Sequence, residues 1–362
     1  MSIDQQSIGE GNTPRAVQYR IDFDMDACTG CGLCEAFCPV EVIEMQAGDI
    51  PPAGSIPGSE PTPSVELVPV AVAPELCWGC ETCVGQCPEG ALTIEALGGK
   101  DAFKDREIAP PLPDEEKALY GEWAAILTEV LGLRFEPVAV SLIPAGDPLP
   151  DVPLPTEPLR YCQSLMAARH GRSLLMPANR HACPDGTAIL GLTELAAKLA
   201  SGELYVLFHK LHDIEAARHM VSERPRLPER SIDATVVSPL SKAATTPQVI
   251  AVACTPEQAM WLLMSSSYYS GHRLDLHASG YNAQCVETTL LPLTTGQINV
   301  SFGCYGCRAS SDVSDDLMFV GIPRELMATT TQGLLELGKK AIPQSRAKIY
   351  LQDATLAYGQ EI

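Results

Sequence analysis

Two copies of one cysteine pattern constrain this 362-residue chain more than any other feature of its sequence. In each copy, four cysteines are separated by two, two and three residues, and a proline follows the fourth cysteine. The copies consist of Cys28, Cys31, Cys34, Cys38 and Pro39, and of Cys77, Cys80, Cys83, Cys87 and Pro88. Thiolates at such short spacing bind thiophilic metal groups. The duplication therefore predicts one metal-binding unit that occurs twice.

The pattern resembles the signature of bacterial two-cluster ferredoxins, over about residues 18–97 and at every ligand position. In those proteins the fourth cysteine of each run ligates the cluster of the other run. The resemblance therefore implies two [4Fe–4S] clusters and a chain that handles single electrons. It implies one cluster on Cys28, Cys31, Cys34 and Cys87, and a second on Cys77, Cys80, Cys83 and Cys38.

Two other uses of paired cysteines fit less well. Zinc also binds paired CxxC units, but it requires neither this spacing nor a trailing proline. A disulfide framework is typical of short secreted chains, and residues 1–20 contain no apolar leader segment. The flanking sequences favour the clusters, because each half predicts a strand, a cysteine loop, a short helix and a second strand. The expected strands are Tyr19–Asp24, Val42–Met45, Val68–Val72 and Ala91–Glu95.

The sequence predicts an α+β protein, with a small ferredoxin-type two-cluster domain followed by a larger mixed α/β domain. The predicted parts are a polar tail (1–17), the ferredoxin domain (18–97) with an inserted Pro/Gly loop (48–63), a linker (98–114) and the mixed domain (115–362). In the mixed domain we expect strands at Val138–Ile143, Ala234–Val237, Val249–Cys254, Asn299–Phe302 and Leu317–Ile322. We expect helices from Asp114 and at Tyr161–His170, Thr187–Lys198, Ile214–Glu223, Pro256–Tyr269 and Arg324–Leu337.

Several phrases of the second domain resemble the family catalogued as domain of unknown function 169, over about residues 117–345. They are Pro137–Val140, Tyr161–Gln163, Ala182–Gly186, Ser238–Leu240, Ser301–Arg308 and Val320–Pro323. The family label names no reaction. The resemblance implies only a domain that often accompanies redox and anaerobic metabolism.

Six further cysteines lie in the second domain: Cys162, Cys183, Cys254, Cys285, Cys304 and Cys307. Cys304 and Cys307 form a CxxC in a Gly-rich turn beside Arg308, a cation that would lower a thiol pKa. Cys183 precedes Pro184, which predicts a helix N-cap that would stabilise its thiolate. We therefore expect Cys183, Cys304, Cys307 and Arg308 to be catalytic.

The remaining candidates have ordinary interpretations as well. Cys162 fits core packing and ligation equally, whereas packing is favoured for Cys285 and Cys254 because free cysteine behaves as a small hydrophobe. We interpret His181 as a solvated turn residue. One hypothesis combines Cys162, Cys183, Cys304 and Cys307 in a third iron–sulfur site. The competing hypothesis is dithiol or covalent thiol chemistry.

The net charge of −20 argues against nonspecific nucleic-acid binding, because phosphates would be repelled. It suits a redox partner with a basic docking face, although acidity also serves solubility alone. No run of 18 apolar residues occurs, so we expect no membrane span. We expect a cytoplasmic protein, where thiols stay reduced, in a cell that lives with little oxygen.

These observations support two function classes. In the first, an iron–sulfur reductase, two clusters deliver low-potential electrons to the second-domain cysteine site for reduction of a small substrate or bound cofactor. Arg180 and Arg308 would bind an anionic group. In the second, an electron-transfer or accessory protein, the second domain binds a partner enzyme or a metallocofactor. A cluster-based regulator is a third class, which no basic helix-turn-helix pattern supports.

Overall fold

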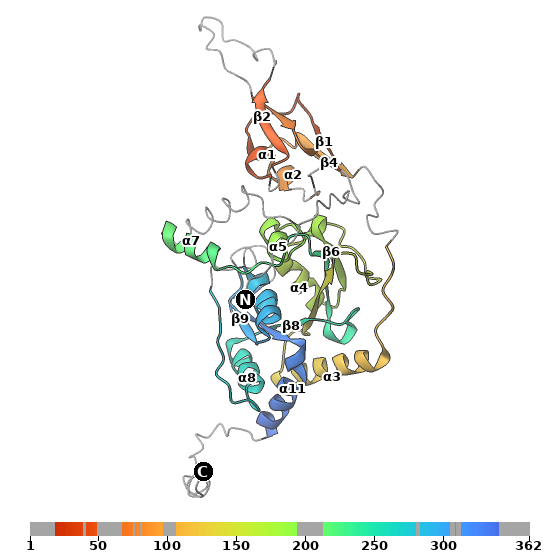
Figure 1. Ribbon diagram of the computed structural model, residues 1–362, viewed down its shortest axis with the longest axis vertical. Coiled ribbons are helices and arrows are strands. Elements are labelled where there is room, and N and C mark those ends of the chain that lie inside the picture. Colours follow the sequence, from red (N-terminus) through yellow and green to blue (C-terminus); the bar gives the residue numbers. More distant parts are fainter. Residues whose placement is uncertain are drawn as a thin grey trace, which may run out of the picture.

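The computed structural model describes residues 19–38, 41–48, 67–74, 77, 79, 82–96, 106–193, 213–279, 283–304, 308 and 313–339. The expected tail, most of the inserted loop, Cys80 and Cys307 lie outside these ranges. Figure 1 shows the small N-terminal domain at one end of the larger domain, next to α5 and β6. The expected fold class, a ferredoxin-type domain followed by a larger mixed domain, is confirmed.

The N-terminal domain consists of two antiparallel strand pairs and two short helices. Strands β1 (Tyr19–Phe23) and β4 (Leu92–Ala96) form one pair, and β2 (Ile43–Ala47) and β3 (Leu67–Ala71) form the other. Helices α1 (Leu33–Ala36) and α2 (Thr82–Gln86) follow the second cysteine of each run. Because the first strand pairs with the last, the two halves of the repeat close on each other.

A six-stranded antiparallel sheet organises the larger domain, in the order β6-β7-β5-β8-β10-β9. The strands are β5 (Val138–Pro144), β6 (Leu174–Pro177), β7 (Ile232–Pro239), β8 (Val249–Cys254), β9 (Asn299–Ser301) and β10 (Met318–Pro323). The five strands expected in this domain all occur with small changes at their ends. Strand β6 was not expected, because its four residues are all buried and show no alternation.

Helices cover both faces of this sheet. The first layer contains α3 (Asp114–Leu131), η3 (Leu240–Lys242), α8 (Pro256–Ser266) and α11 (Arg324–Lys339). The second contains α4 (Tyr161–Arg169), α5 (Pro184–Ile189), η4 (Val286–Leu290) and α9 (Leu291–Thr295). The short turn η2 (Ala178–Arg180) joins β6 to α5, and α7 (Ile214–Ser222) lies away from the sheet in Figure 1.

Strand β8 shows how the sequence divides residues between the two layers. Ile250, Val252 and Cys254 pack with the first layer, whereas Ala251 packs with the second. Successive side chains of a strand point to opposite faces of a sheet, so this alternation follows from the strand itself. It places Cys254 among first-layer apolar side chains, fully buried, as the packing interpretation predicted.

One helix prediction is wrong over residues 190–193. The sequence pattern predicted a helix over Thr187–Lys198, but α5 begins at Pro184 and ends at Ile189, and residues 194–198 lie outside the described ranges. Gly191 has a left-handed φ of 72°, and a Cβ there would lie 2.8 Å from the carbonyl oxygen of Pro228. The chain must turn at this position to pass that backbone, so the helix cannot continue.

Leu262 of α8 is fully buried against the sheet, whereas Met260 of the same helix is 47% exposed. We expect Leu262→Ala to lower the free energy of unfolding by about 2–5 kcal/mol, because it leaves a core cavity. Met260→Ala is the matched control and should cost less than about 0.5 kcal/mol. Anaerobic urea unfolding measures both, and equal effects would contradict the layer assignment.

Candidate functional site

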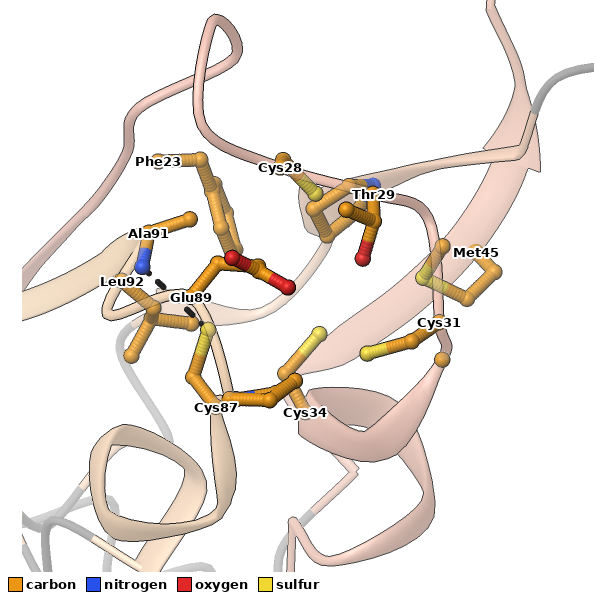
Figure 2. A pocket seen from close by; sticks show the side chains of 13 residues that line it. Phe23, Cys28, Thr29, Cys31, Cys34, Met45, Cys87, Glu89, Ala91 and Leu92 are labelled. Carbon is orange, nitrogen blue, oxygen red and sulfur yellow. Dashed lines mark hydrogen bonds between the residues drawn. The ribbon is translucent and has the colours of Figure 1, made fainter.

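Four thiols of the N-terminal domain surround one pocket. Its lining includes Cys28, Cys31, Cys34 and Cys87. Figure 2 shows the four sulfur atoms turned toward a common space, three from the first cysteine run and one from the second. This is the crossed arrangement that the ferredoxin resemblance implies, in which the fourth thiol comes from the other half of the repeat.

The fourth cysteine of each run accepts the same backbone hydrogen bond. The amide of Val42 donates to Cys38 Sγ at 3.4 Å, and the amide of Ala91 donates to Cys87 Sγ at 3.2 Å. The preceding residues, Glu41 and Gly90, both have a positive φ, of 55° and 63°. The backbone therefore turns in the same way twice to direct an N–H group at a sulfur. Such bonds stabilise thiolates and tune cluster potentials.

The thiols of the second cluster position lie in the core of the domain. Cys38, Cys77 and Cys83 are each 5% exposed and pack together with Val42, Ile43 and Leu92. Gly79, in the loop between Cys77 and Cys80, lies against the Tyr19 ring. Cys80 lies outside the described residues, so three of the four expected thiols can be placed.

The electrostatics of this pocket favour a bound cationic metal group. Burial raises the pKa of Cys34, and the nearby Cys28 and Cys31 thiols raise it further, so a cation between them would stabilise the thiolates. Among the described residues, no group of three His, Cys, Asp or Glu side chains has the geometry of a single-ion site.

A second group of thiols occupies the second helix layer of the larger domain. Cys183 is the N-cap of α5, as predicted, Cys285 directly precedes η4, and Cys304 follows β9. Burial raises the pKa of Cys285 well above its usual value, and the Cys183 and Cys304 thiols raise it further. Cys162 of α4 packs in an apolar cluster that Cys304 contacts. Cysteines from four distant segments therefore approach one another.

Cys285, for which packing was the favoured interpretation, is enclosed and lies close to two other thiols. It is the second of seven consecutive buried residues, 284–290, which include an acid, Glu287. A carboxylate within an otherwise apolar and threonine-containing helix was the available signal, because buried acids are rare without a specific partner.

One cation and one acid accompany the second-layer thiols. Arg224 is only 9% exposed and lowers the pKa of both Cys285 and Glu287, although burial outweighs it at each. The carboxylate of Glu287 accepts hydrogen bonds from the Ser279 amide at 2.6 Å and the Ser301 hydroxyl at 2.5 Å. Burial raises the pKa of Glu287 to about 7, so this acid can exchange a proton near neutral pH.

His181 is buried, so its interpretation as a solvated turn residue is wrong. Its Nε2 atom lies 3.1 Å from Thr235 Oγ1 and 3.2 Å from the Met176 carbonyl, and burial lowers its pKa to about 4. The backbone amide of Ala182 donates a hydrogen bond to the Leu159 carbonyl, which holds the segment around His181 inside the domain. His181 is therefore neutral at pH 7 and orders the chain that leads to Cys183.

Arg308 has a structural position beside the cysteine turn. Its guanidinium donates to the carbonyl oxygens of Phe302, Ser314 and Leu317 at 2.6–3.3 Å. These bonds fix the path of the chain that leaves Cys304, and they leave the guanidinium oriented toward backbone. Arg180 has a buried Nε atom with no hydrogen-bond partner among the described residues. Cys307 lies outside those residues.

A direct hydrogen bond joins the two domains. The side-chain amide of Asn179, in η2, donates to the Tyr19 hydroxyl at 2.6 Å. Tyr19 also lies against Gly79 in the second cysteine run, and Asn179 is four residues before Cys183. One tyrosine thus connects the loop of the second cluster position with the segment that leads to a second-layer thiol.

Family comparisons agree with this division. Residues 27–91 match the family described as a 4Fe-4S dicluster domain, and residues 126–333, more than half of the chain, match DUF169, described as an uncharacterised ArCR. The chain belongs to the DUF169 family. Its N-terminal domain binds [4Fe–4S] clusters and transfers electrons. No curated protein and no solved structure matches the chain.

None of the described helices combines the length and the apolar character that crossing a bilayer requires.

Glu287 and His181 should give the DUF169 domain opposite pH dependences. The raised pKa of Glu287 contributes stability below pH 4.5 that is lost as the pH rises through about 7. The lowered pKa of His181 contributes stability above pH 6.5 that is lost as the pH falls toward about 4. The Glu287→Gln variant has no carboxylate at this position, so only the dependence due to His181 remains.

We therefore expect Glu287→Gln to gain stability relative to wild type by about 1.4 kcal/mol per pH unit between pH 4.5 and 7. Anaerobic urea unfolding at a series of pH values measures this difference. Ser279→Ala is the control, because it keeps the Glu287 carboxylate and the backbone amide of residue 279 that donates to it. A constant difference between wild type and Glu287→Gln would show that Glu287 does not titrate in this range.

Proposed function

We propose that this chain is an iron–sulfur reductase, in which electrons from the N-terminal domain pass to the thiol site of the DUF169 domain. Cys28, Cys31, Cys34 and Cys87 would hold one cluster, and Cys77, Cys80, Cys83 and Cys38 the other. Bound clusters supply single-electron transfer at low potential. The site would use these electrons to reduce a small substrate or a bound cofactor, with Cys183 and Cys304 as the thiols nearest to solvent.

The contact between Tyr19 and Asn179 carries this proposal. It holds the loop of the second cluster position against the segment that ends at Cys183, without any partner protein. A donor tethered in the same chain also has a high effective concentration at the acceptor. Electrons would therefore leave the N-terminal domain from the cluster held by the second cysteine run and Cys38. They would enter the domain at the cluster site shown in Figure 2.

The DUF169 residues supply the remaining requirements of a reduction. Arg224 offers a buried positive charge beside the thiols, which offsets the negative charge that arrives with each electron. Glu287 exchanges protons near pH 7 through its raised pKa, so it suits a proton donor close to the site. Arg308 fixes the cysteine turn through backbone carbonyls, so its proposed role is to position Cys304 and Cys307.

An anaerobic reductive titration of the full chain tests the proposal. The two N-terminal clusters accept about two electrons in total, one each. We expect the chain to take up more, with the excess abolished by Cys304→Ala and retained by Cys254→Ala, a buried thiol of the other layer. Uptake of two electrons by all three proteins would refute a redox site in the DUF169 domain.

The domain contact gives a kinetic test. Tyr19→Phe removes the hydroxyl that accepts from Asn179 and keeps the ring against Gly79. Loss of one hydrogen bond should weaken docking and slow the arrival of the excess electrons about two- to tenfold. Tyr269→Phe changes an exposed ring at the end of α8 and is the control. Equal rates in both variants would contradict the proposed path.

An accessory role is the second candidate, and an apolar groove favours it. The groove lies along α8 and includes Met260 and Met264, which are 47% and 38% exposed, together with Met318. Methionine-rich surfaces adapt to protein partners. Uptake of two electrons in the titration would favour this role, with the DUF169 domain binding the enzyme that receives them.

A further inference from the structure

We propose that Cys183, Cys285 and Cys304 form a third iron–sulfur site, with Cys285 as its buried anchor. This inference names the redox group of the proposed reductase and rests on that function only for the direction of electron flow. It differs from the sequence hypothesis, which omitted Cys285. It concerns a part of the chain for which the family comparison gives no cofactor.

Gly186 shows that two of these thiols share one space. A Cβ built on Gly186 would lie 3.5 Å from Cys183 Sγ and 3.9 Å from Cys285 Sγ. Both distances are ordinary van der Waals contacts, so the two sulfur atoms border the same space beside the Gly186 backbone. The φ of Gly186 is not left-handed, so backbone conformation does not explain the glycine.

Cys304 brings the third thiol from the segment that follows β9. It interacts electrostatically with Cys285 and contacts the apolar cluster around Phe319. The Ser301 hydroxyl accepts from the Gly303 amide at 3.1 Å and donates to Glu287. Because Glu287 and Cys285 lie on one short segment, this bond ties the Cys304 turn to the Cys285 segment.

A buried amide beside Cys285 supplies an independent observation. Gln284 is only 2% exposed, and neither its Nε2 nor its Oε1 atom has a hydrogen-bond partner within the described ranges. An unpaired buried amide costs about 1–3 kcal/mol. Such a group persists where a ligand supplies the missing partner. The sulfides and thiolates of an iron–sulfur cluster accept N–H hydrogen bonds and are tuned by them.

The charges also favour a cationic metal core over a dithiol. A disulfide would consume two of the three thiols and leave the third without a role. Three thiolates in one buried site need more positive charge than Arg224 provides. A metal core bound by all three thiolates would supply the missing positive charge and give each thiol a role.

Three protein thiols leave one corner of a cubane cluster for another ligand. Cys183 and Cys304 are half-buried, whereas Cys285 is enclosed, so a further ligand would reach the site from the side of Cys183 and Cys304. An open coordination position is what distinguishes reactive metal centres from purely structural ones. The class of ligand is a small molecule with a donor atom for iron.

Iron content decides the inference. We expect the full chain, purified without oxygen and without added iron, to contain about twelve irons, of which about eight belong to the N-terminal clusters. Cys285→Ala should retain about eight, and Cys254→Ala, which removes an equally buried thiol from the other layer, should retain about twelve. About eight irons in all three proteins would overturn the third site. A content of about eight irons and one zinc per chain would show that the third site binds zinc and not an iron–sulfur cluster.

A second variant covers the risk that Cys285→Ala does not fold. Cys183→Ala removes a half-buried thiol and leaves no enclosed cavity, so it should fold and also lose about four irons. Circular dichroism monitors folding in each case. A folded Cys183→Ala with about twelve irons would overturn the ligand assignment. A chain with twelve irons whose third centre is not reduced through the N-terminal clusters would retain the site and refute the proposed function.

Discussion

The N-terminal domain depends on sulfur for its core. Of the six residues in its buried cluster, three are cysteines, and the strands around them are five residues long. Apolar burial alone makes so small a domain only marginally stable. Bound clusters would add to its stability, because close thiolates repel one another and a metal group joins them. The contact between Tyr19 and Asn179 begins at a strand of this domain, so it relies on the same fold.

The six-stranded sheet decides which cysteines can meet. Its two faces carry separate helix layers, and strand alternation assigns each side chain to one of them. Cys254 lies in the first layer, while Cys162, Cys183, Cys285 and Cys304 lie on the other side. The second layer also contains the irregular π-helical segment η4, and such segments are frequent at functional sites. The sheet thus separates a packing thiol from those available for chemistry.

The sequence predicted the local features well, because these depend on short-range physics. The cysteine spacing predicted the repeat, and the Cys183–Pro184 pair predicted a helix N-cap. It did not predict the strand order or the proximity of Cys285 to Cys183, since each depends on how distant segments pack. His181 was misassigned for the same reason. Its neighbours in sequence suggest a turn, but a bridge to Leu159 buries it.

The pairing of β1 with β4 has a mechanical consequence. Tyr19 and Ala96 are register partners, so the chain enters and leaves the N-terminal domain at a single corner. The same corner carries the bond to Asn179. The N-terminal domain is therefore tied to the DUF169 domain at one point, both through the chain and through this hydrogen bond.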